Sequence, residues 1–136
     1  MGVVWQHVRE VIQYDLAGKI IVPGFFDMHV HFREPGQEYK EDISTGSHAA
    51  AHGGFTGIMT MPNTNPPIDN PEVLSANIAK TKDHLVDVYH SACASAGRKG
   101  EVMADIAALI KAGALAITDD ASPIAGDDLM RHVLAE

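Results

Sequence analysis

The sequence predicts an α/β fold built from about four consecutive strand–helix units. Apolar runs rich in β-branched and aromatic residues start near Phe25, Phe55, Asp87 and Ala114. They recur about every 30 residues, which is the length of one strand–helix–strand unit. A helical pattern of apolar residues follows each run. Strands that alternate with helices in this way form a parallel sheet with the helices outside it.

The first two units show where their helices begin and end. We expect residues 25–32 to form a strand, followed by a helix that stops at Gly53-Gly54. The small and apolar residues on one face of that helix are Ile43, Gly46 and Ala50. In the second unit, Asn70 is the expected N-cap and Pro71 takes the first helical position. The apolar side of this second helix is expected to carry Leu74, Ile78 and Leu85.

The third and fourth units repeat the pattern. Helical spacing before Gly113 is shown by Val102, Ile106, Leu109 and Ile110. Either Asp127 or Asp128 is expected to start the fourth helix. The apolar stripe of that helix consists of Leu129, Val133 and Leu134.

Four such units make half of a (β/α)8 barrel, which typically needs roughly 250 residues. An open four-stranded sheet is the alternative. The polar residues favour the barrel, because they end the predicted strands where barrel enzymes place their chemistry. His29, His31 and Arg33 end the first run, Asn63 ends the second, and Asp119 and Asp120 end the fourth.

Composition narrows the class of protein. The 136 residues are 46% hydrophobic and carry a net charge of -8, which predicts a soluble globular domain. The acidic balance argues against nucleic acid or an anionic membrane surface as partner. The lone Cys93 excludes an internal disulfide. No apolar run is long enough to span a bilayer, and residues 1–7 lack the pattern of a signal peptide, so we expect a cytoplasmic protein.

The segment 27–33 carries the most specific chemistry. On a strand, Asp27, His29, His31 and Arg33 share one face, because side chains alternate. Packing in a hydrophobic core does not explain why four polar side chains share one face of a strand. A metal site beside an anion-binding site does explain it. Asp27 either orients His29 or serves as a salt bridge or cap at the N-terminal end of the barrel. Further along, the basic pair in the segment 97–100 (GRKG) is expected to lie on a loop surface.

These residues resemble the dihydroorotases of the amidohydrolase superfamily. The resemblance covers about residues 15–136, and its motifs follow in the family's order. The quoted segments are 23–36 (PGFFDMHVHFREPG), 53–56 (GGFT), 61–64 (MPNT) and 116–120 (AITDD). The last segment is similar to the longer bacterial type, in which an aspartate replaces the carbamylated lysine of hydantoinases and allantoinases. The chain departs from the family at Ala121, where glycine usually follows the aspartate pair.

The resemblance implies zinc-dependent interconversion of dihydroorotate and N-carbamoyl-L-aspartate in de novo pyrimidine (UMP) biosynthesis. His29 and His31 would bind zinc, and Asp120, rather than Asp119, would bridge two ions where both are present. Arg33 and Asn63 would hold the substrate carboxylate. Imidazole and carboxylate suit zinc, and the guanidinium fork matches a carboxylate.

The resemblance also implies missing parts. The family takes two more histidines from the fifth and sixth strands and its general base, an aspartate, from the eighth. We therefore expect no catalytic base in this chain and a fragment that is inactive alone. Residues 1-22 would be a remnant of an N-terminal β-sandwich and linker, and residues 23-136 the first half of an amidohydrolase (β/α) barrel.

Two other functions stay open. One is a non-catalytic, dihydroorotase-like structural partner of aspartate transcarbamoylase. The other is a different cyclic amidase, such as an allantoinase or hydantoinase. Half a barrel also leaves open sheet edges and an apolar inner face. We therefore expect association with a second copy, with a complementary half or with aspartate transcarbamoylase.

Overall fold

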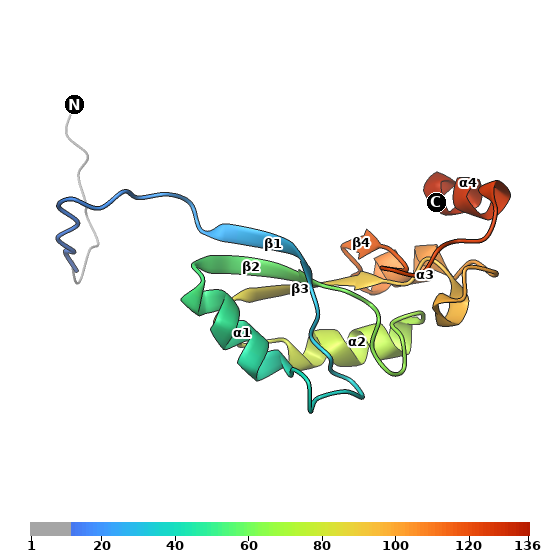
Figure 1. Cartoon of the computed structure of the whole chain (residues 1–136), viewed down its shortest axis with the longest axis horizontal. Coiled ribbons are helices and arrows are strands. Elements are labelled where there is room, and N and C mark those ends of the chain that lie inside the picture. Colours follow the sequence, from blue (N-terminus) through green and yellow to red (C-terminus); the bar gives the residue numbers. More distant parts are fainter. Residues whose placement is uncertain (1–11) are drawn as a thin grey trace, which may run out of the picture.

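A computed structural model describes residues 12–136 of the chain. Its centre is one sheet of four parallel strands, in the order β1-β2-β3-β4 (Figure 1). The strands are β1 (Phe25–Val30), β2 (Phe55–Thr60), β3 (Asp87–Ala92) and β4 (Ala116–Ile117). Spatial order follows chain order, as in the first half of a (β/α)8 barrel. The predicted strand–helix alternation is confirmed.

Each strand is followed by a helix, and the caps explain where the helices begin. The helices are α1 (Ile43–His52), α2 (Pro71–Lys80), α3 (Ile106–Ala112) and α4 (Asp127–Ala135), with a short 3-10 helix, η1 (Ala96–Arg98), after β3. The side chains of Asp42, Asn70 and Asp105 accept backbone N–H bonds at the starts of α1, α2 and α3. Such caps satisfy donors that have no partner within the helix.

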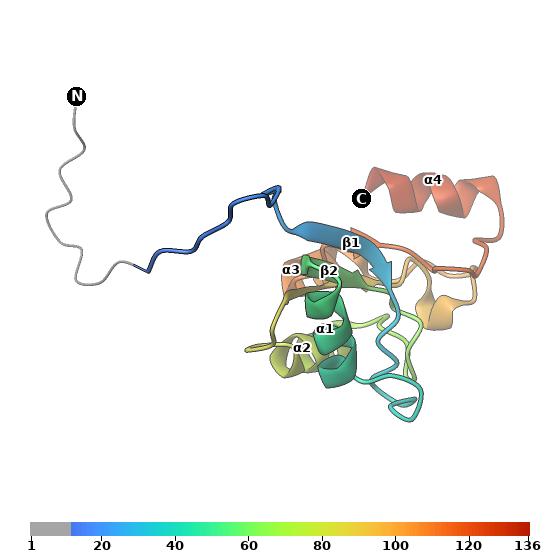
Figure 2. The same ribbon diagram turned by 60° about the vertical axis from the view of Figure 1, so that its left-hand side comes forward.

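The helices α1 and α2 cover one face of the sheet, whereas α4 lies on the opposite side (Figures 1 and 2). Two apolar clusters fill the space under the helices. One consists of Phe32, Ile43, Ile58 and Val86. The other consists of Ile68, Leu74, Ala92, Ala104 and Leu109. Burial of these side chains against the sheet is the main force that holds the units together.

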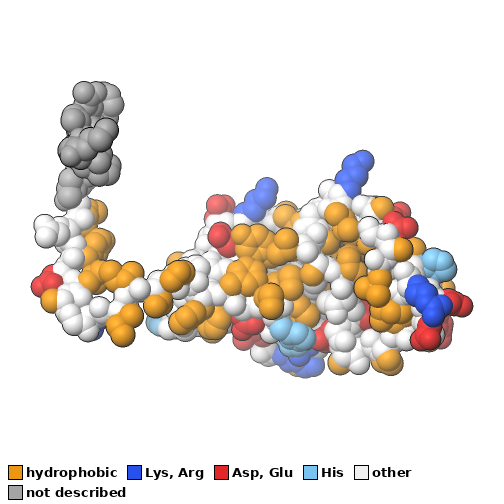
Figure 3. Space-filling model, turned by 90° about the horizontal axis from the view of Figure 1, so that it is seen from above, with side chains coloured by type: hydrophobic (Ala, Val, Ile, Leu, Met, Phe, Trp, Pro, Cys, Tyr) orange, Lys and Arg blue, Asp and Glu red, His pale blue; other side chains and the backbone are white. Residues whose placement is uncertain are grey.

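The other face of the sheet is apolar and open. Phe26 and Tyr89 pack against each other there, with ring centroids 5.6 Å apart, and both lie over Gly57 of β2. Phe26 is 46% exposed and Met28, on the same side of β1 by alternation, is 68% exposed. Figure 3, seen from above, shows hydrophobic side chains gathered over this side of the molecule. We call Phe26, Met28, Gly57 and Tyr89 the open face.

Three element boundaries differ from the predictions. β1 ends at Val30 rather than residue 32, because β2 turns away at Met61-Pro62 and leaves no further partner. α2 ends at Lys80, so Leu85 lies outside it and is 65% exposed. α3 begins only at Ile106, because Asp105 caps it, and Val102 lies in the preceding loop.

The N-terminal segment is extended up to β1, apart from one turn in which the amide of Lys19 donates to Leu16 O at 2.9 Å. Residues 1–11 of the expected β-sandwich remnant lie outside the described residues. Among residues 12–136, no helix has the length and apolar character needed to cross a membrane.

Candidate metal centre

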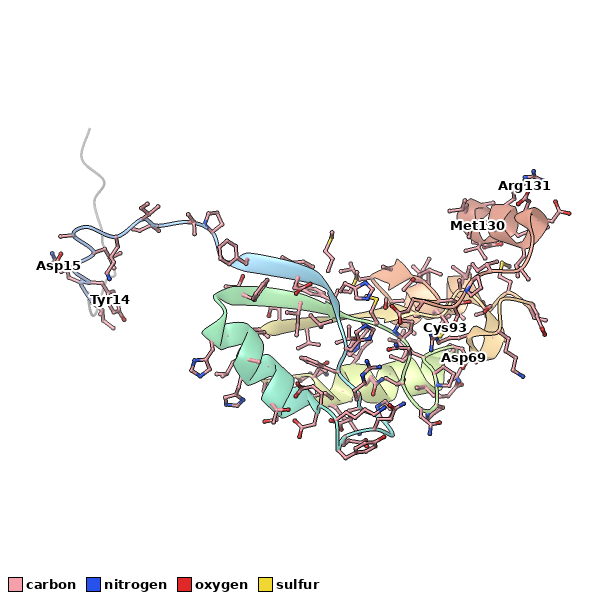
Figure 4. The ribbon with its side chains drawn as sticks, in the orientation of Figure 1. Tyr14, Asp15, Asp69, Cys93, Met130 and Arg131 are labelled. Carbon is pink, nitrogen blue, oxygen red and sulfur yellow. The ribbon has the colours of Figure 1, made fainter. Side chains whose placement is uncertain are left out.

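Three potential ligands from opposite ends of the chain meet at the C-terminal edge of the sheet. One ligand atom each from His29, His31 and Asp120 lie within 4.8 Å of one another. His29 ends β1, His31 follows it, and Asp120 follows β4. Parallel strands bring these positions together, because all their C-terminal ends share one edge. In Figure 4, Asp69 and Cys93 mark the same edge beside the end of β3.

Asp120 is the centre of the cluster. One of its carboxylate oxygens lies 3.1 Å from Nε2 of His29. The other accepts a hydrogen bond from Nδ2 of Asn63 at 2.7 Å. The Asp120 side chain is only 8% exposed, whereas that of His29 is 59% exposed. The carboxylate is therefore held within the edge of the sheet, and the imidazole reaches it from the surface.

Asn63 links the second histidine to the same carboxylate. Its Oδ1 lies 3.0 Å from Nδ1 of His31, so the protonated Nδ1 tautomer donates to it. That bond leaves Nε2 of His31 free as a ligand, which is the usual arrangement behind metal-binding histidines. Asn63 uses one amide hydrogen on Asp120 and keeps the other for a further acceptor.

The donor set fits a divalent ion such as zinc. Two imidazoles and one carboxylate are common zinc ligands. Ligand atoms of one zinc ion lie at most about 4 Å apart, so a small rotation of the exposed His29 side chain brings the three within reach of one ion. Cys93 is buried and does not belong to this group of three, and burial raises the pKa of its thiol to about 12.

Two further residues of the segment 27–33 lie apart from the three potential ligands: Asp27 within β1, and Arg33 after it. The side chain of Asp27 accepts the backbone N–H of His29 at 3.0 Å, so it orients the backbone rather than the imidazole. Arg33 lies in the loop between β1 and α1 and is half-buried. Its guanidinium makes no hydrogen bond with any residue from 12 to 136, so it is available to an anion.

Sequence reasoning missed the residues behind Asp120. Asp119 is buried, at 4% exposure, and turns away from the histidines toward Ser95. Arg98 was expected on a loop surface, but its side chain is 19% exposed and bonds to the backbone of Asp119. The loop after β3 folds back onto β4, and no local sequence pattern signals such a contact.

Comparison with known proteins defines the class first. The fold matches the L-hydantoinase (dihydropyrimidinase) from Arthrobacter aurescens with a TM-score of 0.66 and 26% identity. The match covers 76% of this chain and 22% of that one. The fold is therefore the first half of an amidohydrolase barrel.

The family follows from sequence comparison. A family model described as "Dihydro-orotase-like" matches residues 18–136. The dihydroorotase of Citrifermentans bemidjiense is 49% identical over 121 residues, covering 88% of this chain and 28% of that protein. The dihydroorotase of Aquifex aeolicus is 50% identical over 128 residues, covering 93% and 30%. This chain belongs to the dihydro-orotase-like family, and it spans less than a third of the length of these relatives.

Proposed function

We propose that the chain is part of a zinc-dependent dihydroorotase, a hydrolase that interconverts dihydroorotate and N-carbamoyl-L-aspartate in pyrimidine biosynthesis. The observation that carries this proposal is the meeting of His29, His31 and Asp120 at one edge of the sheet. Relatives about half identical in sequence are named dihydroorotase. The small soluble substrates agree with the expected cytoplasmic location.

His29, His31 and Asp120 are the proposed zinc ligands. The two neutral imidazoles offer nitrogen atoms, and the carboxylate offsets the charge of the ion. When bound, zinc lowers the pKa of a water molecule to about 7 and polarises a carbonyl group. The hydrogen bond from His31 to Asn63 holds the imidazole in the tautomer that this role needs.

Arg33 and Asn63 are the proposed contacts to the substrate carboxylate. Arg33 offers two parallel N–H groups, the geometry that a carboxylate accepts best. Asn63 offers its remaining amide hydrogen. The two residues come from neighbouring loops that are joined by a bond from the amide of Asn65 to Pro35 O at 2.9 Å.

The described residues supply only part of a hydrolytic site. The proposal takes two further histidines and the general-base aspartate from later strands of the barrel, which must come from a longer chain or a second chain. The 136 residues are thus proposed to be inactive alone. Residues 1–22 are proposed to be the end of a β-sandwich, and residues 23–136 to be the barrel half.

The zinc site is tested by measuring the stoichiometry and affinity of zinc for the purified chain and two variants. His29→Ala removes a proposed ligand, and His52→Ala removes an exposed histidine at the end of α1. We expect zinc binding by the original chain and by His52→Ala, and its loss in His29→Ala. Equal binding by all three would overturn the site.

The reaction is tested in a chimera that joins residues 23–136 to the remaining barrel of the Aquifex aeolicus dihydroorotase. We expect hydrolysis of dihydroorotate, a large increase in KM for Arg33→Met, and no change for the matched control Arg131→Met on α4. A chimera that binds zinc but never turns over dihydroorotate would overturn the proposed reaction.

The L-hydantoinase neighbour favours a second candidate, hydrolysis of another cyclic amide. The two candidates differ in the charge of the ring substrate. Only an anionic ring needs the guanidinium of Arg33, because a neutral ring offers no carboxylate. A substrate panel on the chimera separates them: preference for a neutral hydantoin, unaffected by Arg33→Met, would replace dihydroorotate.

A further inference from the structure

The adjacent aspartates after β4 have different surroundings. Asp120 faces His29 and Asn63. Asp119 is turned the other way and is buried beneath the loop that follows β3. A buried carboxylate is retained only where hydrogen bonds replace its hydration. The partners of Asp119 therefore indicate what it does.

Both carboxylate oxygens of Asp119 are used. One oxygen accepts the backbone N–H groups of Ala94 at 2.9 Å and Ser95 at 3.1 Å. The other accepts the hydroxyl of Ser95. That hydroxyl in turn accepts the backbone N–H of Gly100 at 2.8 Å. The Asp119 side chain thus joins the segment after β4 to Ala94 and Ser95, at the start of the loop between β3 and α3. Through the Ser95 hydroxyl it is also linked to Gly100, further along that loop.

Arg98, in the loop between β3 and α3, also bonds to the segment after β4. Its guanidinium donates to the backbone carbonyl of Asp119 at 3.2 Å from Nε and 2.9 Å from Nη2. Nη2 also donates to Oγ of Ser122 at 3.1 Å and lies 3.9 Å from the Asp120 carboxylate. Arg98 therefore contacts the chain on both sides of Asp120, at the backbone carbonyl of Asp119 and at the side-chain hydroxyl of Ser122.

Asp120 needs such support. Its φ is +55°, in the left-handed region that side chains other than glycine rarely adopt. A non-glycine residue stays there only when its surroundings fix it. The following residue is Ala121, so no neighbouring glycine relieves the loop. The backbone amide of Asp120 donates to Oγ1 of Thr118 at 2.9 Å, which adds one more restraint.

We propose that Asp119 is a positioning residue that holds Asp120 in place to bind zinc, together with Ser95, which its carboxylate bonds, and Arg98, which bonds its backbone carbonyl. We call these three residues the latch. This inference rests on the proposed function, because it takes Asp120 as a zinc ligand. Of the three, only Arg98 approaches a proposed ligand, with Nη2 3.9 Å from the Asp120 carboxylate. The contribution of the latch is to fix the backbone from which the Asp120 carboxylate projects toward the two histidines.

The test uses two small changes at one hydrogen bond. Asp119→Asn keeps the shape of the side chain but replaces the acceptor that faces the Ser95 hydroxyl. Ser95→Ala removes the same bond from its other end and is the milder variant if Asp119→Asn folds poorly. The control is Asp105→Ala, which removes an aspartate that caps α3 through the amide of Ala108 at 3.0 Å and has no contact with the latch.

Two readouts separate positioning from general stability. The first is zinc affinity of the full chain by competition with a chelator. We expect Asp119→Asn and Ser95→Ala each to weaken it at least about tenfold, as loss of groups behind a metal ligand does. The double variant should lose little more than Ser95→Ala, because both changes remove the bond between Asp119 and Ser95, and Ser95→Ala also removes the acceptor of the Gly100 N–H. The second readout is hydrogen exchange of the Asp120 and Ser122 amides without zinc, which should speed up while α1 and α2 stay protected.

The outcomes are distinguishable. Unchanged zinc affinity in Asp119→Asn, beside an original chain that binds zinc, overturns the latch and leaves the proposed function standing. If Asp105→Ala weakens zinc affinity as much as Asp119→Asn does, the latch is also overturned, because the loss of affinity then reflects a general loss of stability of the fold. An original chain that binds no zinc overturns the proposed site, and this inference with it.

Discussion

His90 is an ionisable side chain buried inside the sheet. It is 4% exposed and lies in β3. Its ring nitrogens lie 2.9 Å from the hydroxyl of Thr60 and 3.0 Å from that of Thr81. Burial lowers the pKa of His90 from 6.5 to about 4, because no anion replaces the water that a charged ring would lose. Folding therefore requires the neutral ring.

This burial predicts acid sensitivity. The unfolded chain protonates His90 near pH 6.5, whereas the folded chain does so only near 4, so stability is full above 6.5 and falls as the pH drops toward 4. Between pH 7 and pH 5 the loss from His90 is about 2 kcal/mol. Urea unfolding of the metal-free chain measures it. His90→Gln should lack this part of the pH dependence, whereas His132→Gln on α4 should keep it; identical slopes in all three would contradict the assignment.

Among single residues, those within recognisable motifs were the ones that the sequence marked as candidate site residues. The His-x-His pair, Asn63 and Asp120 were predicted to meet, and the structure brings them to one edge of the sheet. Ser95 and Arg98 were missed, since their role depends on a loop that folds back over β4. Serine and arginine in a loop of glycines look alike whether they face solvent or a buried carboxylate.

At the element scale, the loops after β1 and β2 support each other. The amide of Asn65 donates to Pro35 O at 2.9 Å. Glu34 accepts Nζ of Lys80 from α2 at 2.8 Å. These contacts fix the loops that carry Arg33 and Asn63. The two proposed substrate contacts are therefore set relative to each other by backbone and not only by their own side chains.

A substitution at Gly36 tests the contact between the loops after β1 and β2. The φ of Gly36 is +95°, and a Cβ there would lie 2.0 Å from the carbonyl oxygen of Asn65. Gly36→Ala therefore combines backbone strain with a clash against backbone, and we expect it to lower the free energy of unfolding by about 2–4 kcal/mol. The matched control is Gly18→Ala, at φ +77° with open space around it, which keeps the backbone strain without the clash and should cost about 1–2 kcal/mol. Denaturant unfolding compares them, and equal costs would show that the loops are not locked.

The elements themselves were largely predictable from the chain. Strand starts near Phe25, Phe55 and Asp87 are confirmed, as are the helix start after Asn70 and the stop after His52. Caps and glycines carry their signal within a few residues, so sequence suffices for them. The errors at Leu85 and Val102 arose because apolar residues continue the helical spacing past the end of α2 and before the start of α3. Thr81, at the end of α2, bonds to His90 of β3, a contact that local sequence does not signal, whereas α3 begins at the Asp105 cap.

At the scale of the whole molecule, the sheet is unfinished on one side. The open face leaves Phe26, Met28 and Tyr89 between 41% and 68% exposed. β1 and β4 are the outer strands of the sheet, with backbone groups free to pair. A patch of this kind normally lies against another surface.

We therefore expect the purified chain to self-associate, which sedimentation velocity measures. Met28→Lys places a charge on the open face and should shift the chain toward monomer. Leu134→Lys, at an equally exposed leucine on α4, should leave the distribution unchanged. A monodisperse monomer formed by the original chain would show that the open face needs no partner.

The wide separation of the candidate ligands along the chain affects the order of folding. His29 and His31 are near neighbours in sequence, but Asp120 lies beyond β4, so all four strands must be paired before the three candidate ligands meet. Parallel pairing closes long loops and is slow compared with helix formation. A nascent or refolding chain would thus acquire its metal late. In a refolding experiment, metal uptake would report when the last strand joins the sheet, whereas the circular dichroism of the helices would report the earliest steps.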